Sequence, residues 1–401
     1  MTTTITERAL NRSTLARQLL LEREPLGVED AVRRVVALQA QQPASPYLAL
    51  WNRLSGFDAA DLDAALAGYR VVKSTLMRIT LHAVHADDYR ALREAVEPTV
   101  RGARLGDPRF RRSGLTAQDA DELLPELLAR ASAGPEGPCT SAELGEWLAE
   151  RVAGLLSERG GVAGKLEPAA WRMLRQYAPL WHAPVGGPWS FVENRHAFVA
   201  AGGGVPVPAD AERSAASLKV LVRRYLEGFG PASVADVAQF ALVQKGRVRA
   251  ALAELADEVE QFAGPRGAVL YDVPGGARPD GDAPAPPRLM AMWDSVLLAY
   301  ADRGRVLPPE YRKHVTRVNG DVLPTLLVDG HVAGVWRMAR DGTGVEAAAF
   351  RPLAASQWAG LEAEAGALTA FVRDREPRVY GRYDHWWAKG LPVVERRVLA
   401  G

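Results

Sequence analysis

Residues 28–43 are VEDAVRRVVALQAQQP, and the organisation of the chain follows from this stretch. Apolar side chains recur at helical spacing from Val28, and Gln39 falls where the next apolar side chain is required. Pro43 cannot continue a helix and pushes Gln42 toward extended backbone. The pattern therefore predicts a helix from Val28 that ends near Gln39.

Gln39 places a polar side chain on the apolar face of this predicted helix. Burying an amide costs free energy unless its donors and acceptors find partners. Gln39 therefore either completes a structural hydrogen-bond network or borders a cavity that admits a ligand. Residues two apart face different ways on a helix but share one side of extended backbone, so Gln39 and Gln41 converge only if the helix ends here. Neutral amides can orient a water or stabilise charge, but they are not strong bases.

The composition is that of an ordinary globular protein with 401 residues, 48% of them hydrophobic and 24% charged. The formal charge of +1 excludes a global basic field, so a nucleic-acid site has to be a local patch. Cys139 is the only cysteine, which excludes an internal disulfide and a thiolate zinc cluster. Neither a signal peptide nor a membrane span is recognisable, so we expect a soluble cytoplasmic protein without membrane contact.

The order of predicted elements repeats three times as three helices followed by a hairpin. This is the order of a winged helix-turn-helix, in which the third helix reads DNA and the hairpin forms a flanking wing. Residues 101–112 hold five arginines and predict a basic loop after the first copy. The predicted elements are 13–21, 28–39, 47–54 and a strand pair at 71–84; 120–131, 141–152, 171–177 and a hairpin at 180–192; and 217–229, 233–242, 247–262 and a strand at 264–272.

The last part of the chain predicts a different unit. Asp329-Gly330 between alternating apolar runs is a strong hairpin signal. The predicted elements here are a helix at 293–300, strands at 322–328, 332–338 and 345–350, and a helix at 356–372. We therefore predict a mainly α fold with small β hairpins (α+β), built from tandem winged helix-turn-helix units and a C-terminal mixed α/β unit. The predicted units are 1–112, 113–208, 209–287 and 288–401.

Two histidines in the first strand pair raise the question of a metal site. His82 and His85 are three residues apart and point to opposite faces of a strand, which disfavours a shared metal. Arg78, Thr80 and His82 share one parity, so they are expected to line one side of a groove.

Cations open the long helix of the third copy, at Lys245 and Arg247. Positive charge at a helix start opposes the helix dipole and indicates an anionic neighbour such as phosphate, although a solvated charged turn explains it equally well. Arg224 carries the same two interpretations. The chain has neither a phosphate-binding Gly-rich loop with Lys and Ser or Thr nor a Gly-X-Ser-X-Gly elbow, which argues against a nucleotide-driven motor or an ordinary serine hydrolase.

Several motifs between residues 11 and 371 together resemble the AlkZ-type winged-helix DNA glycosylases. They are LQAQ at 38–41, PYLALWNRL at 46–54, MRITLH at 77–82, RYL at 224–226, YADR at 300–303 and VDGHVAGVWR at 328–337. The resemblance implies a C shape around a DNA-sized channel, with a Gln-aliphatic-Gln motif at its centre that Gln39 and Gln41 match. Two departures stand out: Gln42 adds a third amide, and Trp293-Asp294-Ser295 replaces the usual Phe-Asp-Glu.

The resemblance implies catalysis by Gln39 and Gln41. With the basic residues above, we assign DNA contacts to Arg78, His82, Arg224, Lys245, Arg247, Arg303 and Arg337. Gln41 places the chain near a branch linked to self-resistance against DNA-alkylating antibiotics, whereas relatives with Asp there are similar to a broader-acting branch.

The resemblance, together with the chemistry of two neutral amides, implies a monofunctional glycosylase that releases N7-alkylguanine, including bulky or crosslinked adducts, from double-stranded DNA. We expect it to need no cofactor or metal and to act as a monomer that joins the nucleoid when bound to DNA. The alternative is a DNA-binding regulator or a drug-sequestering protein without chemistry, which the winged helices alone would support equally.

Overall fold

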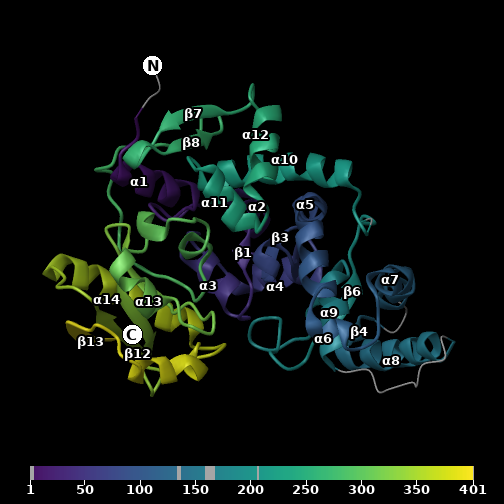
Figure 1. Cartoon of the computed structure of the whole chain (residues 1–401). Helices are drawn as coiled ribbons and strands as arrows, with labels where there is room; N and C mark the ends of the chain where they lie inside the picture. Colours follow the sequence, from purple (N-terminus) through teal and green to yellow (C-terminus); the bar gives the residue numbers. More distant parts are fainter. Residues whose placement is uncertain (1–3, 133–136, 159–167, 206, 401) are drawn as a thin grey trace.

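The computed structural model describes residues 4–132, 137–158, 168–205 and 207–400. Figure 1 shows the first helix (purple) at the upper left and the rest of the N-terminal segment toward the centre. The C-terminal segment (yellow) lies to the lower left, residues near 100–200 (blue to teal) to the lower right and residues near 210–270 (teal to green) above. Helices with small sheets make up the molecule, which confirms the predicted α+β class.

The N-terminal helices form, but the first lies earlier in the chain than the predicted 13–21 and the second is shorter than predicted. Helix α2 (Val28–Val35) ends four residues before Gln39, so the prediction that it reaches Gln39 is wrong. Val36 adopts φ 72°, which stops the helix, and the chain then enters a short strand, β1 (Leu38–Gln39). Pro43 therefore does not cause the break. The other helices of this segment are α1 (Glu7–Arg17), α3 (Ser45–Trp51) and α4 (Ala59–Ala67).

The predicted strand pair exists as a hairpin of β2 (Val71–Thr75) and β3 (Leu81–His85). Within the described residues it belongs to a six-stranded sheet in the order β1-β3-β2-β5-β6-β4. The remaining strands are β5 (Leu180–Ala183), β6 (Ala197–Ala200) and β4 (Cys139–Thr140). The predicted hairpin at 180–192 is wrong, because β5 pairs with β6, which lies beyond that segment. Because Lys73 pairs with His182, β5 and β6 belong to the same sheet as the first hairpin.

The basic stretch 101–112 is helical, so its prediction as a loop is wrong. It comprises the end of α5 (Ala86–Leu105) and the short α6 (Pro108–Arg111). The buried side chains at 89, 92, 96 and 100 continue helical spacing into this stretch, and apolar burial overrides the charge pattern. The following helices are α7 (Ala117–Ala131), α8 (Ser141–Glu158) and α9 (Pro168–Tyr177).

The third predicted copy contains α10 (Ala211–Phe229), α11 (Val234–Ala241) and α12 (Lys245–Glu254). The prediction of a helix up to Phe262 is wrong, because Phe262 pairs with Leu270 in a two-stranded sheet. Its strands are β7 (Glu260–Ala263) and β8 (Val269–Asp272). Apolar spacing alone did not separate the helix from the strand that follows it.

The C-terminal segment holds a sheet in the order β13-β12-β11-β10-β9. The Asp329-Gly330 hairpin is confirmed, with φ values of 50° and 78° that suit a turn of the primed type. The helix predicted over 293–300 is wrong: only a 3-10 turn at Ser295–Leu297 forms, after Trp293 with φ 54°. The elements are β9 (Arg288–Leu289), α13 (Arg312–Val315), β10 (Thr325–Val328), β11 (His331–Met338), β12 (Gly344–Ala349), α14 (Ala355–Val372) and β13 (Glu395–Ala400).

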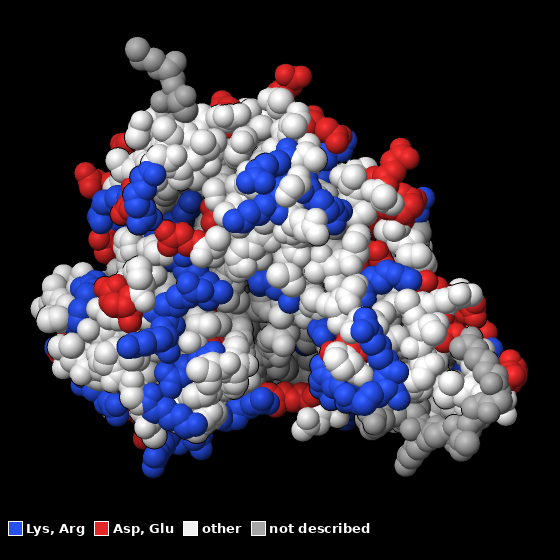
Figure 2. Space-filling view, in the orientation of Figure 1, with Lys and Arg blue, Asp and Glu red and all other residues white. Residues whose placement is uncertain are grey.

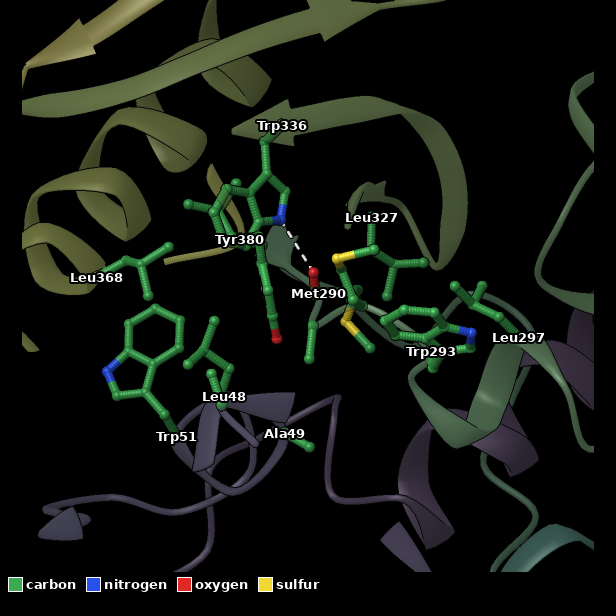
Figure 3. Packing of buried hydrophobic residues seen from close by; sticks show 14 of the residues in the cluster. Leu48, Ala49, Trp51, Met290, Trp293, Leu297, Leu327, Trp336, Leu368 and Tyr380 are labelled. Atoms are coloured by element: carbon green, nitrogen blue, oxygen red, sulfur yellow. Dashed lines mark hydrogen bonds between the residues drawn. The ribbon is translucent and has the colours of Figure 1, made fainter. Parts of the chain in front are cut away.

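The largest core joins the N-terminal and C-terminal segments. Figure 3 shows Leu48 and Trp51 of α3 facing Tyr380 and Trp336, with the indole of Trp336 donating to the carbonyl of Met290 at 2.9 Å. Burying each aromatic side chain contributes roughly 2–3 kcal/mol relative to leaving it exposed. The N-terminal segment that carries Gln39 is thereby fixed to the C-terminal sheet. The boundaries between the four predicted units stay predictions.

Candidate active site

Gln39 lies on β1 beside the first hairpin and not on a helix. Its Cα partner is His82 of β3, and the backbone nitrogen of Ala40 donates to the carbonyl of Leu81 at 2.8 Å. The side chain is 4% exposed. Its Nε2 donates to Thr80 Oγ1 at 2.9 Å and its Oε1 accepts from Arg78 at 2.8 Å. The amide is therefore held from both ends, which leaves one N–H and one lone pair uncommitted.

Gln41 is held by the same hairpin, at the residue that follows Thr80. It is exposed, and its Oε1 accepts from the backbone nitrogen of Leu81 at 2.8 Å. Gln42, by contrast, is 6% exposed, and its Oε1 accepts from the nitrogen of Ala44 at 2.6 Å. The amides of Gln39 and Gln41 are thus anchored at consecutive residues of one backbone segment, whereas Gln42 holds the following loop.

The tip of the hairpin carries the cation of the site. Arg78 and Ile79 have φ values of 53° and 57°, which L-residues rarely adopt and which a β-branched residue adopts only under strain. This conformation brings the Arg78 guanidinium to Gln39, to the ring of His82 at 3.2 Å and to the carbonyl of Phe240 on α11 at 3.2 Å. No carboxylate of the described residues forms an ion pair with Arg78. Burial and the nearby charge of Arg303 lower the pKa of Arg78 to about 10, so it stays charged at neutral pH.

His82 is buried and neutral. Its Nδ1 lies 3.1 Å from the carbonyl of Thr80 and must donate there, so Nε2 is the acceptor for Arg78. Burial and the charge of Arg78 hold the pKa of His82 well below its usual 6.5. His82 therefore orients Arg78 and is not a proton donor at neutral pH. The expected grouping of Arg78, Thr80 and His82 is found around Gln39, although only His82 lies on a strand.

The structure brings one further predicted DNA contact to this site and leaves the others apart. Arg303 acts on Arg78 through its charge and donates to Thr316 at 3.2 Å. Lys245 is exposed at the start of α12. The other three are held by protein partners: Arg224 by Asp88, Glu227 and the carbonyl of Arg33, Arg247 by Ser214, and Arg337 by Glu346 and the ring of Trp387.

Sequence reasoning missed the contributions of more distant elements. Phe240, which supplies a carbonyl and a ring to Arg78, carries no signal in the sequence. Ser295 reaches from the C-terminal segment to the carbonyl of Ala37 at 2.8 Å, next to β1. Asp294, next to Ser295, accepts two 2.9 Å hydrogen bonds from Arg53, and both side chains of this ion pair are fully buried.

The face that carries this region is hollowed and basic. Figure 2 shows a deep notch at its centre, with Lys and Arg gathered on both flanks. Among the described residues, no group of three or more His, Cys, Asp and Glu is placed to hold a metal ion. Within the same residues, no helix has the length and apolar character needed to cross a membrane.

A family model for DNA glycosylases described as AlkZ-like matches residues 32–371. The chain belongs to the AlkZ-like DNA glycosylase family. It is therefore an enzyme that hydrolyses N-glycosidic bonds in DNA, and the alternative without chemistry is not retained.

Two further comparisons, one of sequence and one of structure, both match a DNA glycosylase of Streptomyces sahachiroi. An interstrand DNA cross-link repair glycosylase is 27% identical over an alignment of 337 residues that covers 81% of this chain and 85% of the relative. The solved structure of the DNA glycosylase AlkZ superposes with a TM-score of 0.72 at 22% identity, covering 94% of this chain and 98% of the other. The second comparison shows that this AlkZ-like chain shares the fold of that structure.

Proposed function

We propose that the enzyme is a monofunctional glycosylase for N7-alkylguanine in double-stranded DNA, with a water positioned by Gln39 and Gln41. The observation that carries the proposal is the pair of amides held at consecutive residues. Gln39 Nε2 donates to the hydroxyl of Thr80, Gln41 Oε1 accepts from the backbone nitrogen of Leu81, and each carbonyl oxygen keeps a lone pair. Within the described residues no carboxylate contacts either amide. The site is therefore built for a reaction without a strong general acid or base.

The chemistry of the substrate matches such a site. Alkylation at N7 makes guanine cationic, so the base leaves as a neutral molecule and needs no protonation. The remaining tasks are to place a water against the sugar and to stabilise the oxocarbenium-like transition state, which the partial negative charge of two amide oxygens can do. His82, being neutral and committed to Thr80 and Arg78, supports this assignment because it cannot protonate an uncharged base.

DNA contact is the second part of the proposal. Arg303, near Arg78, and the exposed Lys245 are assigned direct contact with phosphate, where a cation gains most from counterion release. Arg78 and His82 support the amide pair beside the DNA. Arg224, Arg247 and Arg337 stay predicted DNA contacts, and each also stabilises the scaffold through the partners described above.

The substrate range follows from the relatives and the motif. One relative is named for interstrand cross-link repair, and the second position of the motif is Gln41 in this chain. We propose that bulky or crosslinked N7 adducts are substrates and that the enzyme provides self-resistance to a DNA-alkylating natural product. It is proposed to act as a monomer on DNA in the cytoplasm.

Incubation with a duplex containing N7-methylguanine tests the reaction. Release of the free base and formation of abasic sites without strand cleavage are expected for the wild type. Gln39→Ala and Gln41→Ala are expected to lower the single-turnover rate by about 100-fold, the loss typical of removing one group that stabilises a transition state. Wild-type rates in both variants, or no base release by the wild type, would exclude the proposed mechanism.

A further inference from the structure

Basic side chains gather on one face of the six-stranded sheet, where β2 of the first hairpin pairs with β5. Lys73 and His182 are Cα partners there, and His182 is in turn the partner of Phe198 on β6. Side chains at paired positions point to the same face of a sheet. The ring of His196 lies 5.8 Å from that of His182, and the guanidinium of Arg175 on α9 lies over the ring of Phe198 at 5.1 Å. We call Lys73, His182, His196 and Arg175 the basic cluster.

No anionic group balances the basic cluster within the described part of the chain. No carboxylate there forms an ion pair with any of its four members. Burial, followed by the charges of Lys73, Arg175 and His196, holds the pKa of His182 well below its usual 6.5, and burial lowers the pKa of Lys73 to about 7. Groups that repel one another in this way are stabilised when an anion joins them.

The ammonium of Lys73 is unused but reaches solvent. Lys73 is only 5% exposed, and its nitrogen lies over the ring of Phe191 at 4.2 Å. It donates no hydrogen bond to any described residue, yet it is not one of the fully enclosed polar atoms that lack a partner, so the nitrogen itself touches solvent. The same holds for the ring nitrogens of His182. The stem of the lysine is therefore enclosed, while its charged end and the neighbouring imidazole stay accessible.

This arrangement is costly without a ligand. A cation taken out of most of its water and given no acceptor destabilises the folded protein, and the contact with the ring of Phe191 offsets only a part of that cost. A phosphate group would supply what is missing, because its oxygens accept hydrogen bonds from an ammonium, a guanidinium and an imidazole N–H at once.

The basic cluster lies near the amide pair along the first hairpin. Thr75, two residues from Lys73, is the Cα partner of Leu81, and the nitrogen of Leu81 donates to Gln41. Two residues of a strand span about 7 Å, which is about twice the rise of roughly 3.4 Å per nucleotide along one DNA strand. Lys and Arg also gather on the right flank of the notch in Figure 2, over the region where Figure 1 shows α6 and α9.

We propose that the basic cluster binds a phosphate group of the DNA strand that carries the target base, about two nucleotides from that base. Lys73 and Arg175 would supply the positive charge, and His182 would donate one N–H. The inference rests on DNA as the substrate of this family and not on the type of lesion, because a backbone phosphate is present whichever base is damaged. It adds a contact on β2 and β5 to those assigned to Arg303 and Lys245.

The salt dependence of DNA binding tests this contact. Each phosphate that a protein neutralises contributes roughly 0.9 to the slope of log Kd against log salt concentration. With an undamaged fluorescent duplex between about 50 and 200 mM KCl, we expect Lys73→Met to lower this slope by about 0.9 and to raise Kd at the lowest salt by roughly tenfold. His182→Phe keeps a ring but loses the N–H, and it should raise Kd by about fivefold.

Lys219→Met is the matched control, because the ammonium of Lys219 on α10 is already paired with Glu254 at 2.7 Å. Its slope should equal that of the wild type, and its Kd should stay within twofold. Since the duplex carries no lesion, the result does not depend on whether N7-alkylguanine is released. A wild-type slope in Lys73→Met together with a wild-type Kd in His182→Phe overturns the assignment to DNA.

Thermal unfolding separates this role from a structural one. Because the ammonium lacks an acceptor in the free protein, Lys73→Met is expected to keep or raise the melting temperature. A lower melting temperature in this variant would show that Lys73 stabilises the fold, and it would overturn the proposal.

Inorganic phosphate distinguishes a DNA strand from a free anion. At constant ionic strength, replacing chloride by phosphate should raise the melting temperature more in the wild type than in Lys73→Met, since the general effect of phosphate on folded proteins is the same in both. If this difference appears while the DNA slope is unchanged, the site takes a free phosphate group and the assignment to the DNA strand fails. If neither difference appears, the basic cluster is not a phosphate site.

Discussion

Replacing Thr80 by Val removes one hydroxyl that holds Gln39 and leaves the shape of the side chain almost unchanged. In the wild type, Thr80 Oγ1 accepts from Gln39 Nε2 at 2.9 Å and donates to the carbonyl of Met77 at 3.1 Å. Gln39 would keep its hydrogen bond from Arg78 but could rotate about it. A net loss of about 1 kcal/mol, typical of one hydrogen bond, corresponds to roughly a fivefold lower rate if it appears in the transition state.

Single-turnover kinetics on the N7-methylguanine duplex measures this effect. Thr80→Ser retains the hydroxyl and is expected to stay within twofold of the wild type. Urea unfolding of each variant reports how much of the change is stability, and we expect a loss of about 1 kcal/mol for Thr80→Val. A Thr80→Val enzyme with the wild-type rate would refute the idea that the orientation of Gln39 limits catalysis.

Three further predictions concern pH and the scaffold. The pKa of His82 is lowered in the folded state, so the folded protein favours the neutral ring. The stability that this preference contributes is complete above the ordinary pKa of 6.5 and is lost as pH falls below it. Between pH 6.5 and pH 5 the unfolding free energy, measured by urea titration, should therefore drop more steeply in the wild type than in His82→Gln. Asp294→Asn breaks the buried pair with Arg53 and should lower the unfolding free energy by about 3–5 kcal/mol, whereas the exposed change Asp282→Asn should have little effect on the urea midpoint. Gly330→Ala adds a Cβ that overlaps Asn11 at a φ of 78° and should lower the melting temperature, while Gly246→Ala, where the Cβ meets open space, should not.

Local signals predicted local structure well. The Asp329-Gly330 turn and the hairpin of β2 and β3 formed where their residues indicate, because turn chemistry and alternation act over a few neighbours. The end of α2 could not be predicted in this way, because valine rarely adopts a positive φ and nothing in the residue type indicates the observed 72° at Val36. The chain turns here to let β1 pair with β3, which lies about forty residues later in the sequence. No local sequence pattern indicates this pairing.

The sequence singled out Gln39 but placed it on the wrong type of element. Gln39 stood out as a polar residue on an apolar stripe, and it is indeed buried, but on a strand. Its partner Arg78 was a predicted DNA contact, yet the strained turn that brings it to Gln39 depends on contacts with α11. Since α2 ends at Val35, Pro43 does not set the end of this helix as the sequence predicted.

The sheet shared by the first two predicted units limits how this enzyme can be recombined. Lys73 of β2 pairs with His182 of β5, so a chimaera that exchanges residues 113–208 with a relative also exchanges the neighbour of β2. A graft that fails to restore this pairing leaves a strand edge with unpaired backbone groups, which invites aggregation. Crossover points that keep residues 71–85 and 180–200 from the same parent are therefore the sound choice for building hybrid repair enzymes.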